Sequence, residues 1–432
     1  MYPHRKRPRR YGILAISPLF VLAVLFLGFS LHLGDFSRVP LLIIFSATSI
    51  YSLFITRGYP AEERIARFSR GAGSPNLLLM IWIFVMAGAF AKSAKDMGAI
   101  SATVDLTLRL LPPEMLLAGI FIAACFVSLS VGTSVGTIVA LVPVATGLAD
   151  KTGTAIPLLT AATVGGALFG DNLSFISDTT IAATRSVGCR QSDKFKVNLQ
   201  IVLPAAVVTF IIYLIMGQNA TTAPAIPEIS LLKVLPYIIV LLMALTGCNV
   251  LIVLLIGNIL TGCIGIATGC YDLNGWVSSM TSGISGMAEL ILITMLAGGL
   301  LELIRSGGGI AYLIRLLVRR VHSKRGAEYC IAALVSVTNL CTANNTVAIL
   351  TTGGLANDIS EKYGIDKRKS ASLLDTFSCC IQGLLPYGAQ LLIAGGMAGI
   401  SPIEIIPCLY YPMIMGAAAL LAIGFRFPRK YS

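Results

Sequence analysis

The polar residues of this chain gather in three short stretches inside otherwise apolar sequence. The first covers residues 128–137, the second 165–180 and the third 338–346. They combine carboxylates, amides, hydroxyls and glycines, and an ionised carboxylate at the centre of a bilayer is strongly disfavoured unless it is paired or hydrated. Residues that are so unfavourable to bury indicate a functional site.

The second stretch carries two acids, Asp171 and Asp178. Their spacing corresponds to two helical turns and a shared face, and a break at the glycine and serines between them would bring them closer. Hard oxygen donors suit a small hard cation. Burial in an apolar medium favours the protonated form of a carboxylate. We therefore predict a site that holds either sodium or a proton at Asp171 and Asp178.

Other oxygen-bearing residues of the three stretches are predicted to complete this site. Those expected to contact the ion or proton are Asn172, Ser174, Ser177 and Thr180. Those expected to support it from broken helices are Ser130, Thr133, Ser134, Thr137, Asn339, Thr342, Asn344 and Asn345. Three further candidates are Asp375, Gln382 and Gln390.

Each acid also has a structural alternative. Asp171 could cap a helix or lie near the interface. Asp178 precedes Arg185 by seven residues and could form a salt bridge at the membrane surface. Asp375 follows Lys369 closely, so an interfacial position is an equal alternative for it.

Composition indicates which elements position these residues. The chain has 432 residues, of which 56% are hydrophobic and only 12% charged, and its mean hydropathy is +0.84. Soluble proteins carry about 25% charged residues. The sequence therefore predicts an all-α polytopic membrane protein and excludes a cytosolic enzyme or a nucleic-acid-binding domain. The three histidines lie in or near loops, which argues against a zinc or haem site, and no resident cofactor is expected.

Apolar runs predict about 12–14 membrane segments when the arms of broken helices are counted separately. Two long regions, 114–149 and 327–357, each split at a polar interruption into two arms, as in re-entrant hairpins. Basic loops stay in the cytoplasm, which places 57–70, 185–196, 305–325 and both termini inside. The loops 218–230, 269–283 and 395–402 lack Lys and Arg and are predicted outside. The expected location is the bacterial inner membrane.

An internal repeat divides the chain. Residues 85–100 align with 295–310 at an offset of 210, and residues 137–141 resemble 346–350 at an offset of 209. We predict a first repeat over 1–217, an external linker over 218–230 and a second repeat over 231–432. Seven segments in each half would insert the second half upside down. Inverted repeats with broken helices are typical of secondary transporters, which bind at the midplane; chance similarity between apolar helices is the alternative.

Two blocks, residues 132–137 and 169–180, resemble the two best-known blocks of the NhaC-type sodium/proton antiporter family, within the ion transporter superfamily. The likeness extends over most of the chain. The family usually has a proline where this chain has Phe175, and often a histidine where it has Asn172. The resemblance implies coupled transport, and the family also includes exchangers of organic acids or amino acids.

These observations predict a secondary active transporter, not an enzyme, that exchanges sodium for protons. The alternative is a sodium- or proton-coupled carrier of a small organic acid or amino acid. No Lys or Arg is predicted at the midplane, so a carboxylate substrate would depend on the broken-helix N-termini at Thr133 and Asn344. The expected partners are sodium ions, protons and the lipid bilayer, and a homodimer is compatible with the sequence.

Overall fold

Apolar runs in lipid form helices because the backbone must satisfy its hydrogen bonds within the segment. The structure is a computed structural model that describes residues 9–33, 40–174, 177–217, 230–246, 248–318 and 321–431. The helices of the first half are α1 Arg9–Leu33, α2 Leu41–Ile55, α3 Ala61–Ala72, α4 Pro75–Met97, α5 Ala99–Leu110, α6 Leu116–Val131, α7 Ser134–Thr152, α8 Ile156–Leu173, α9 Asp178–Val187 and α10 Gln191–Gly217. The helices of the second half are α11 Leu231–Leu245, α12 Val250–Ala267, α13 Leu273–Gly286, α14 Ala288–Ser306, α15 Gly309–Val318, α16 Lys324–Thr342, α17 Asn345–Tyr363, α18 Lys367–Leu384, α19 Ala389–Ala398, α20 Pro402–Ile405 and α21 Tyr410–Gly424. The predicted linker lies, except for Ser230, outside the described residues.

The helices confirm a polytopic all-α protein. Among the described residues, six helical stretches are long and apolar enough to cross a membrane: Leu77–Met97, Ser134–Thr152, Gln191–Gly217, Val250–Ala267, Leu273–Ser306 and Lys367–Ala398. A seventh is the pair Pro402–Cys408 and Tyr410–Gly424, which bends by 56°. The shorter apolar helices are Ile13–Phe26, Leu41–Ile55, Leu116–Leu129, Leu231–Met243 and Gly309–Val318. The predicted 12–14 segments counted the arms of broken helices separately and included several of these shorter helices as segments.

Helix starts repeat at a nearly constant spacing. The starts of α7, α8 and α9 recur 211 residues later as the starts of α17, α18 and α19, in the pairs Ser134 and Asn345, Ile156 and Lys367, and Asp178 and Ala389. The duplication seen in short sequence blocks therefore extends to whole helices.

Left-handed backbone positions repeat in the same way. Such positions end helices because they turn the chain out of the helical path. In the described part of the chain, ten of them form five pairs spaced by 210 or 211 residues: Gly58 and Gly269, Gly98 and Gly308, Gly132 and Ala343, Gly153 and Gly364, and Gly188 and Gly399. Arg426 is the remaining one. Matching turns at matching spacing argue against chance similarity between apolar helices.

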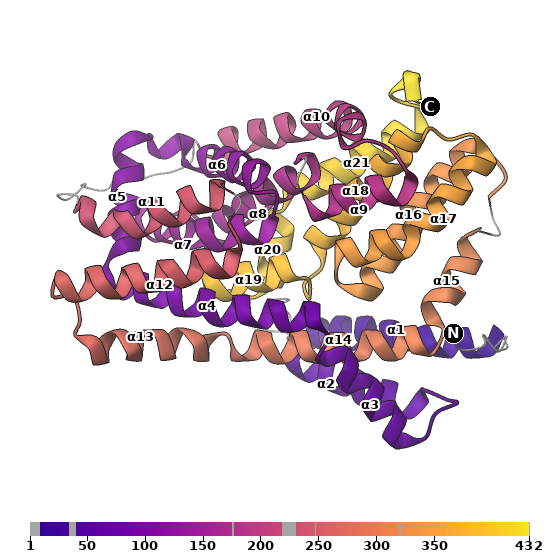
Figure 1. Cartoon of the computed structure of the whole chain (residues 1–432), viewed down its shortest axis with the longest axis horizontal. Coiled ribbons are helices and arrows are strands. Elements are labelled where there is room, and N and C mark those ends of the chain that lie inside the picture. Colours follow the sequence, from indigo (N-terminus) through magenta and orange to yellow (C-terminus); the bar gives the residue numbers. More distant parts are fainter. Residues whose placement is uncertain are drawn as a thin grey trace.

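The second repeat is inverted relative to the first. Figure 1 shows α5 at one end of the long axis and its counterpart α15 at the opposite end. The start of α1 and the C-terminal turn η4, Arg429–Tyr431, lie toward the same end as α15. The odd number of crossings predicted for the first half would produce this relation.

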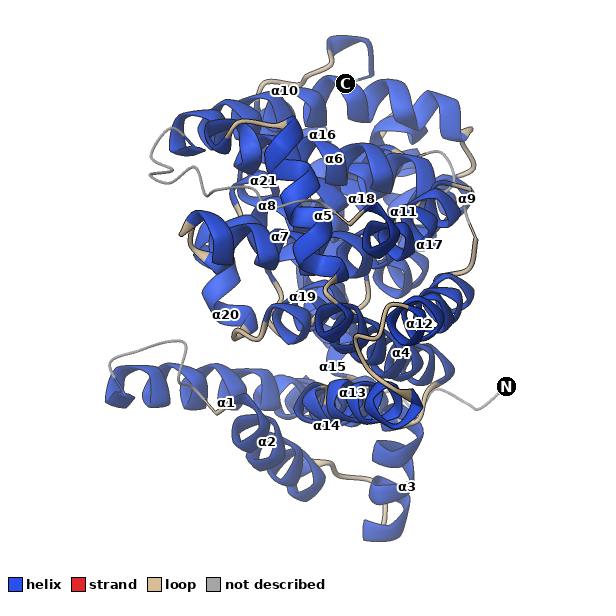
Figure 2. Cartoon of the chain, turned by 90° about the vertical axis from the view of Figure 1, so that its left-hand side faces the viewer, coloured by secondary structure: helices blue, strands red, loops and turns tan. Residues whose placement is uncertain are grey.

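The helices pack in two groups. Figure 2 shows α1, α2, α3, α13 and α14 as a layer below the main bundle, with α4 and α12 next to that layer. Helix α4 crosses α13 where Gly88 meets Gly283, and α3 crosses α14 where Gly71 meets Gly298. A Cβ atom on any of these glycines would collide with the carbonyl of its partner. The two crossings are equivalent by the repeat, so both depend on direct backbone contact.

Labelling of introduced cysteines tests the inverted topology. In a background that lacks the accessible native cysteines, Arg190→Cys should react with an impermeant thiol reagent only from the cytoplasmic side. Asn274→Cys, in the first turn of α13, should react only from the outside, because loops rich in Lys and Arg stay in the cytoplasm. Both positions are exposed in the structure. Labelling of both from the same side would contradict the inverted arrangement.

Candidate ion-binding site

Four helix breaks meet at one cavity of about 700 Å³. Two breaks divide hairpins, α6 from α7 and α16 from α17, and two divide long helices, α8 from α9 and α18 from α19. The parts of the breaks that line the cavity are residues 132–135, Asp171, 178–179, 343–347, Gln382 and 389–390. An apolar wall comes from α4 and from the start of α12. The three polar stretches, far apart in sequence, therefore converge on one place.

Asp171 is the buried acid of this cavity. It lies in the last turn of α8 with 6% of its surface exposed. Ser134, at the start of α7, donates a hydrogen bond of 2.9 Å to Asp171 Oδ2. Ser177, which precedes α9, donates one of 2.7 Å to Oδ1. Two hydroxyls thus fix both carboxylate oxygens, and each oxygen keeps acceptor capacity for a cation or a proton.

A chain of amides joins Asp171 to the second repeat. Gln390 Nε2 donates to Ser134 Oγ at 3.0 Å, and Gln382 Nε2 donates to Gln390 Oε1 at 2.9 Å. Gln382 follows Asp171 by 211 residues, so it is the repeat counterpart of that acid. The two halves therefore present a carboxylate and a neutral amide at equivalent positions.

Asp178 lines the same cavity from the other side of the α8–α9 break. It is the first residue of α9, and its side chain is exposed. A carboxylate at a helix N-terminus is stabilised by the helix dipole. Thr179, which the sequence did not nominate, also lines the cavity, and its hydroxyl hydrogen-bonds Ser177 Oγ at 2.8 Å.

The tip of the α16–α17 hairpin supplies two asparagines with different roles. Asn344 Oδ1 accepts from the backbone N–H of Val347 at 2.9 Å and so caps α17. Asn345 also lines the cavity and is 7% exposed. Its Oδ1 accepts from the Thr346 N–H, whereas its Nδ2 has no hydrogen-bond partner among the described residues. Asn345 therefore offers a free donor to the cavity.

Several of the predicted site residues form their hydrogen bonds outside the cavity. Ser174 Oγ donates to the Leu129 carbonyl at 2.9 Å, and Thr180 Oγ1 accepts from Lys194. Asn339 Nδ2 donates to the Ser378 carbonyl at 2.8 Å. Thr137 and Thr342 bond to the carbonyls of Thr133 and Asn344. These side chains form hydrogen bonds to protein groups near the breaks, and none of them lines the cavity. The side chain of Ser130 lies outside the described residues.

A buried ion pair lies behind Asp171. Lys194 Nζ pairs with Asp375 Oδ2, and the two side chains are 1% and 0% exposed. Asn172 joins this cluster, because its side-chain Oδ1 accepts from Asn198 Nδ2 at 2.7 Å. Asp375 is thus fully buried within the protein and paired with a lysine. The predicted cytoplasmic loop 185–196 includes the first turns of α10, and the Lys194 side chain within it is buried.

The burial of Lys194 was not predicted from the sequence, because the residue lies among other charged residues. Its neighbours Arg190, Asp193 and Lys196 suggested a solvated loop. Helical periodicity could have revealed it, since Lys194 falls on the same face of α10 as the buried residues Val197, Asn198, Ile201 and Ala205. Extending the apolar stripe by one turn toward the N-terminus would have included the lysine.

The sequence model of the Na+/H+ antiporter family matches the chain twice, over residues 10–218 and 217–427. The chain belongs to the Na+/H+ antiporter family. The predicted resemblance to the NhaC-type antiporters is thereby confirmed, and the double match agrees with the repeated helices.

Curated relatives are similar over most of their length. The "Na(+)/H(+) antiporter NhaC" of Alkalihalophilus pseudofirmus is 22% identical over 87% of both chains. The protein of the same name from Bacillus subtilis is 23% identical over 97% of both. The "Malate-2H(+)/Na(+)-lactate antiporter" of Bacillus subtilis is 21% identical over 83% of both. Antiporters of more than one substrate class thus resemble this member of the family.

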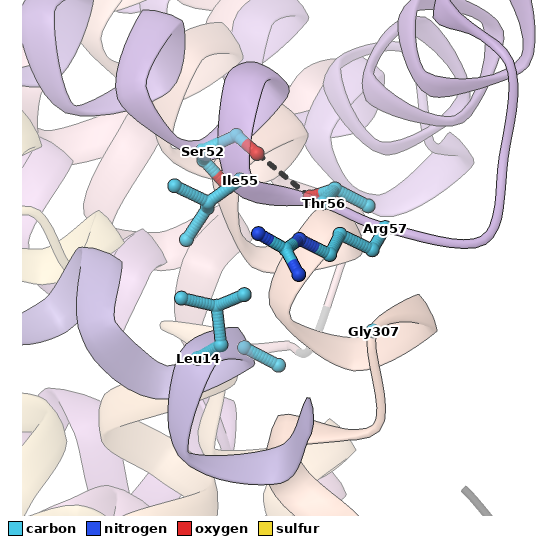
Figure 3. A pocket seen from close by; sticks show the side chains of 7 residues that line it. Leu14, Ser52, Ile55, Thr56, Arg57 and Gly307 are labelled. Carbon is cyan, nitrogen blue, oxygen red and sulfur yellow. Dashed lines mark hydrogen bonds between the residues drawn. The ribbon is translucent and has the colours of Figure 1, made fainter. Parts of the chain in front are cut away.

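A second hollow in this antiporter lies far from the breaks in sequence. It is bounded by α1, α2 and the residue after α14, and the Arg57 guanidinium points into it (Figure 3). Its volume is only about 20 Å³, and no acid lines it. The described residues contain no cluster of three or more His, Cys, Asp or Glu side chains suited to a metal ion. The cavity at the four breaks therefore remains the candidate site.

The two asparagines of the hairpin tip should respond differently to substitution. Asn344→Ala removes a helix cap and should destabilise the protein by about 1 kcal/mol. Asn345→Ala removes the free Nδ2 donor, which could bind a carboxylate, and the second lone pair of Oδ1, which could bind a cation. It should weaken apparent affinity for the transported ion or co-substrate about fivefold, the equivalent of one hydrogen bond. Thermal unfolding and transport in proteoliposomes measure the two effects. Unchanged affinity in Asn345→Ala would show that the tip is only a packing turn.

Proposed function

We propose that this protein exchanges sodium ions for protons across the bacterial inner membrane. The observation that carries the proposal is the pair Asp171 and Asp178, which face one cavity at the meeting point of four broken helices. None of the described residues that line this cavity is basic. Family membership supports antiport, and the acids supply a site at which a cation and a proton compete.

The proposed exchange depends on Asp171 holding one ligand at a time. Ser134 and Ser177 hold its carboxylate in place while a sodium ion binds its oxygens. Protonation removes the negative charge that attracts the ion, so sodium affinity should rise as the pH rises. The pair Lys194–Asp375 carries no net charge, which leaves the cavity with the negative charge of Asp171 and Asp178. Binding of one sodium ion or of one proton reduces that negative charge by the same amount.

Inverted repeats supply a route for alternating access. Each half brings one hairpin tip and one broken helix to the cavity, and the arms cross between halves: α9 packs on α17, and α19 packs on α7. Rocking one repeat against the other around a central site opens it to each side in turn. The positions of the basic loops support a cytoplasmic side for the end that carries both termini.

A carrier of a small organic acid or amino acid is the second candidate. The cavity is much larger than a bare cation requires, and Asn345 offers it a free donor. The relative named as a malate and lactate antiporter fits this class. Everted vesicles distinguish the two candidates, because sodium alone should evoke proton movement from the exchanger. Movement only after addition of a carboxylate or an amino acid would favour the carrier.

Neutralising either cavity acid should abolish exchange. Asp171→Asn and Asp178→Asn keep size and hydrogen-bonding capacity but remove the titratable charge, so sodium and protons no longer compete. The measurement is exchange rate against pH in proteoliposomes at matched protein levels.

Asp105→Asn is the matched control for these variants. Asp105 is buried and pairs with Lys151 at 2.5 Å, and it does not line the cavity. This variant should retain exchange. Wild-type rates and pH dependence in both cavity variants would show that the acids are structural.

A further inference from the structure

We propose that Lys194 is a positioning residue of the transport site: it ties the two arms of the broken helix α8–α9 together and so holds Asp171 and Asp178 in their relative places. The inference rests on the proposed function, because it assigns Lys194 a role in sodium binding. Lys194 does not line the cavity, so its role is to hold the ligands and not to contact the ion.

The lysine ammonium bridges the helix break. Lys194 Nζ donates to the backbone carbonyl of Asn172 at 2.6 Å and to Thr180 Oγ1 at 2.8 Å. Asn172 belongs to the last turn of α8, and Thr180 to the first turn of α9. A carbonyl in the last turn of a helix lacks an intrahelical partner and carries partial negative charge. A cation at this point therefore joins the end of one arm to the start of the next.

Both cavity acids sit directly beside these contacts. Asp171 immediately precedes Asn172, and Asp178 precedes Thr180 by two residues. A shift of either arm would change the separation of the two carboxylates and the hydrogen bond from Ser177 to Asp171. Partners that orient the ligands of a metal ion change its affinity by about 10–100-fold when they are removed.

The second repeat completes the arrangement. Asp375, from α18, pairs with Lys194 and supplies the countercharge that a buried ammonium requires. Asn198, one turn after Lys194 on α10, donates to the Asn172 carbonyl at 3.1 Å and to Asp375 Oδ2 at 3.4 Å. The break in the first repeat is thus fixed against a helix of the second, across the repeat interface where the site lies.

The test removes both charges of the pair at once. Lys194→Gln alone would leave Asp375 buried without a countercharge, which destabilises a fold strongly. The double variant Lys194→Gln/Asp375→Asn leaves no lone charge but loses the ammonium at the break. We expect a normal protein level in the membrane and a KM for sodium about tenfold higher than that of the wild type in proteoliposomes.

A second buried pair provides the matched control. Lys369 and Glu328 form an ion pair at 3.1 Å with side chains that are 0% and 1% exposed, and neither residue lines the cavity. The double variant Lys369→Gln/Glu328→Gln should keep the wild-type KM for sodium. An equal rise in KM in both double variants would overturn the positioning role, because it would reflect a general loss of buried charge.

The remaining outcomes are also decisive. A wild-type KM in Lys194→Gln/Asp375→Asn overturns this inference alone. Absence of sodium-driven proton movement in the wild type overturns the proposed function, and this inference with it. If the double variant does not reach the membrane, Thr180→Val replaces it, since valine keeps the ion pair but removes one acceptor at the break. Its KM for sodium should then rise severalfold, and an unchanged KM overturns the proposal.

Discussion

A helix that is interrupted inside a membrane leaves backbone groups that water does not reach, and these groups must find partners in the protein. This fold brings four interruptions together, and side chains near the breaks form hydrogen bonds to backbone groups of another segment. Ser128 Oγ donates to the Ala167 carbonyl at 2.5 Å, and Asn339 Nδ2 donates to the Ser378 carbonyl at 2.8 Å. The two donors lie 211 residues apart in sequence, and so do the two acceptors. The duplication therefore kept the hydrogen bond at this position although the donor side chain changed.

The candidate site consists of the polar side chains that are not used to satisfy backbone hydrogen bonds. Asp171, Asp178 and Asn345 face the cavity, whereas most of the surrounding hydroxyls bond to carbonyls. The duplication produced two equivalent positions, and Asp171 occupies one while Gln382 occupies the other. A near-symmetrical framework, which suits alternating access, thus holds different chemical groups at equivalent positions.

Much of this arrangement is predictable from the sequence, because it follows from composition and repetition. Low charge predicts membrane helices, matching blocks predict the repeats, and the polar interruptions predict the breaks. The acids at 171 and 178 stand out because carboxylates are rare in apolar sequence. The inversion is predicted from the loop charges, because loops rich in Lys and Arg stay on the cytoplasmic side of the membrane.

The sequence is less informative about which side chains line the cavity. Ser174, Thr180 and Asn339 look equivalent to Ser134 and Asn345 in composition, yet their partners are carbonyls or a lysine that lie far away along the chain. Lys194 was hidden for the converse reason, since its charged neighbours resemble a surface loop while its own side chain turns inward. Tertiary contacts decide both cases, although the helical periodicity of α10 does place Lys194 on the buried face.

Proton release on sodium binding tests the central claim most directly. Sodium is added to the purified protein in weakly buffered detergent solution near neutral pH, with choline as the control cation, and the released protons are counted with a pH indicator. If Asp171 holds either ligand but not both, the wild type releases protons in a saturable manner and Asp171→Asn releases none. Equal proton release from wild type and Asp171→Asn would contradict the account.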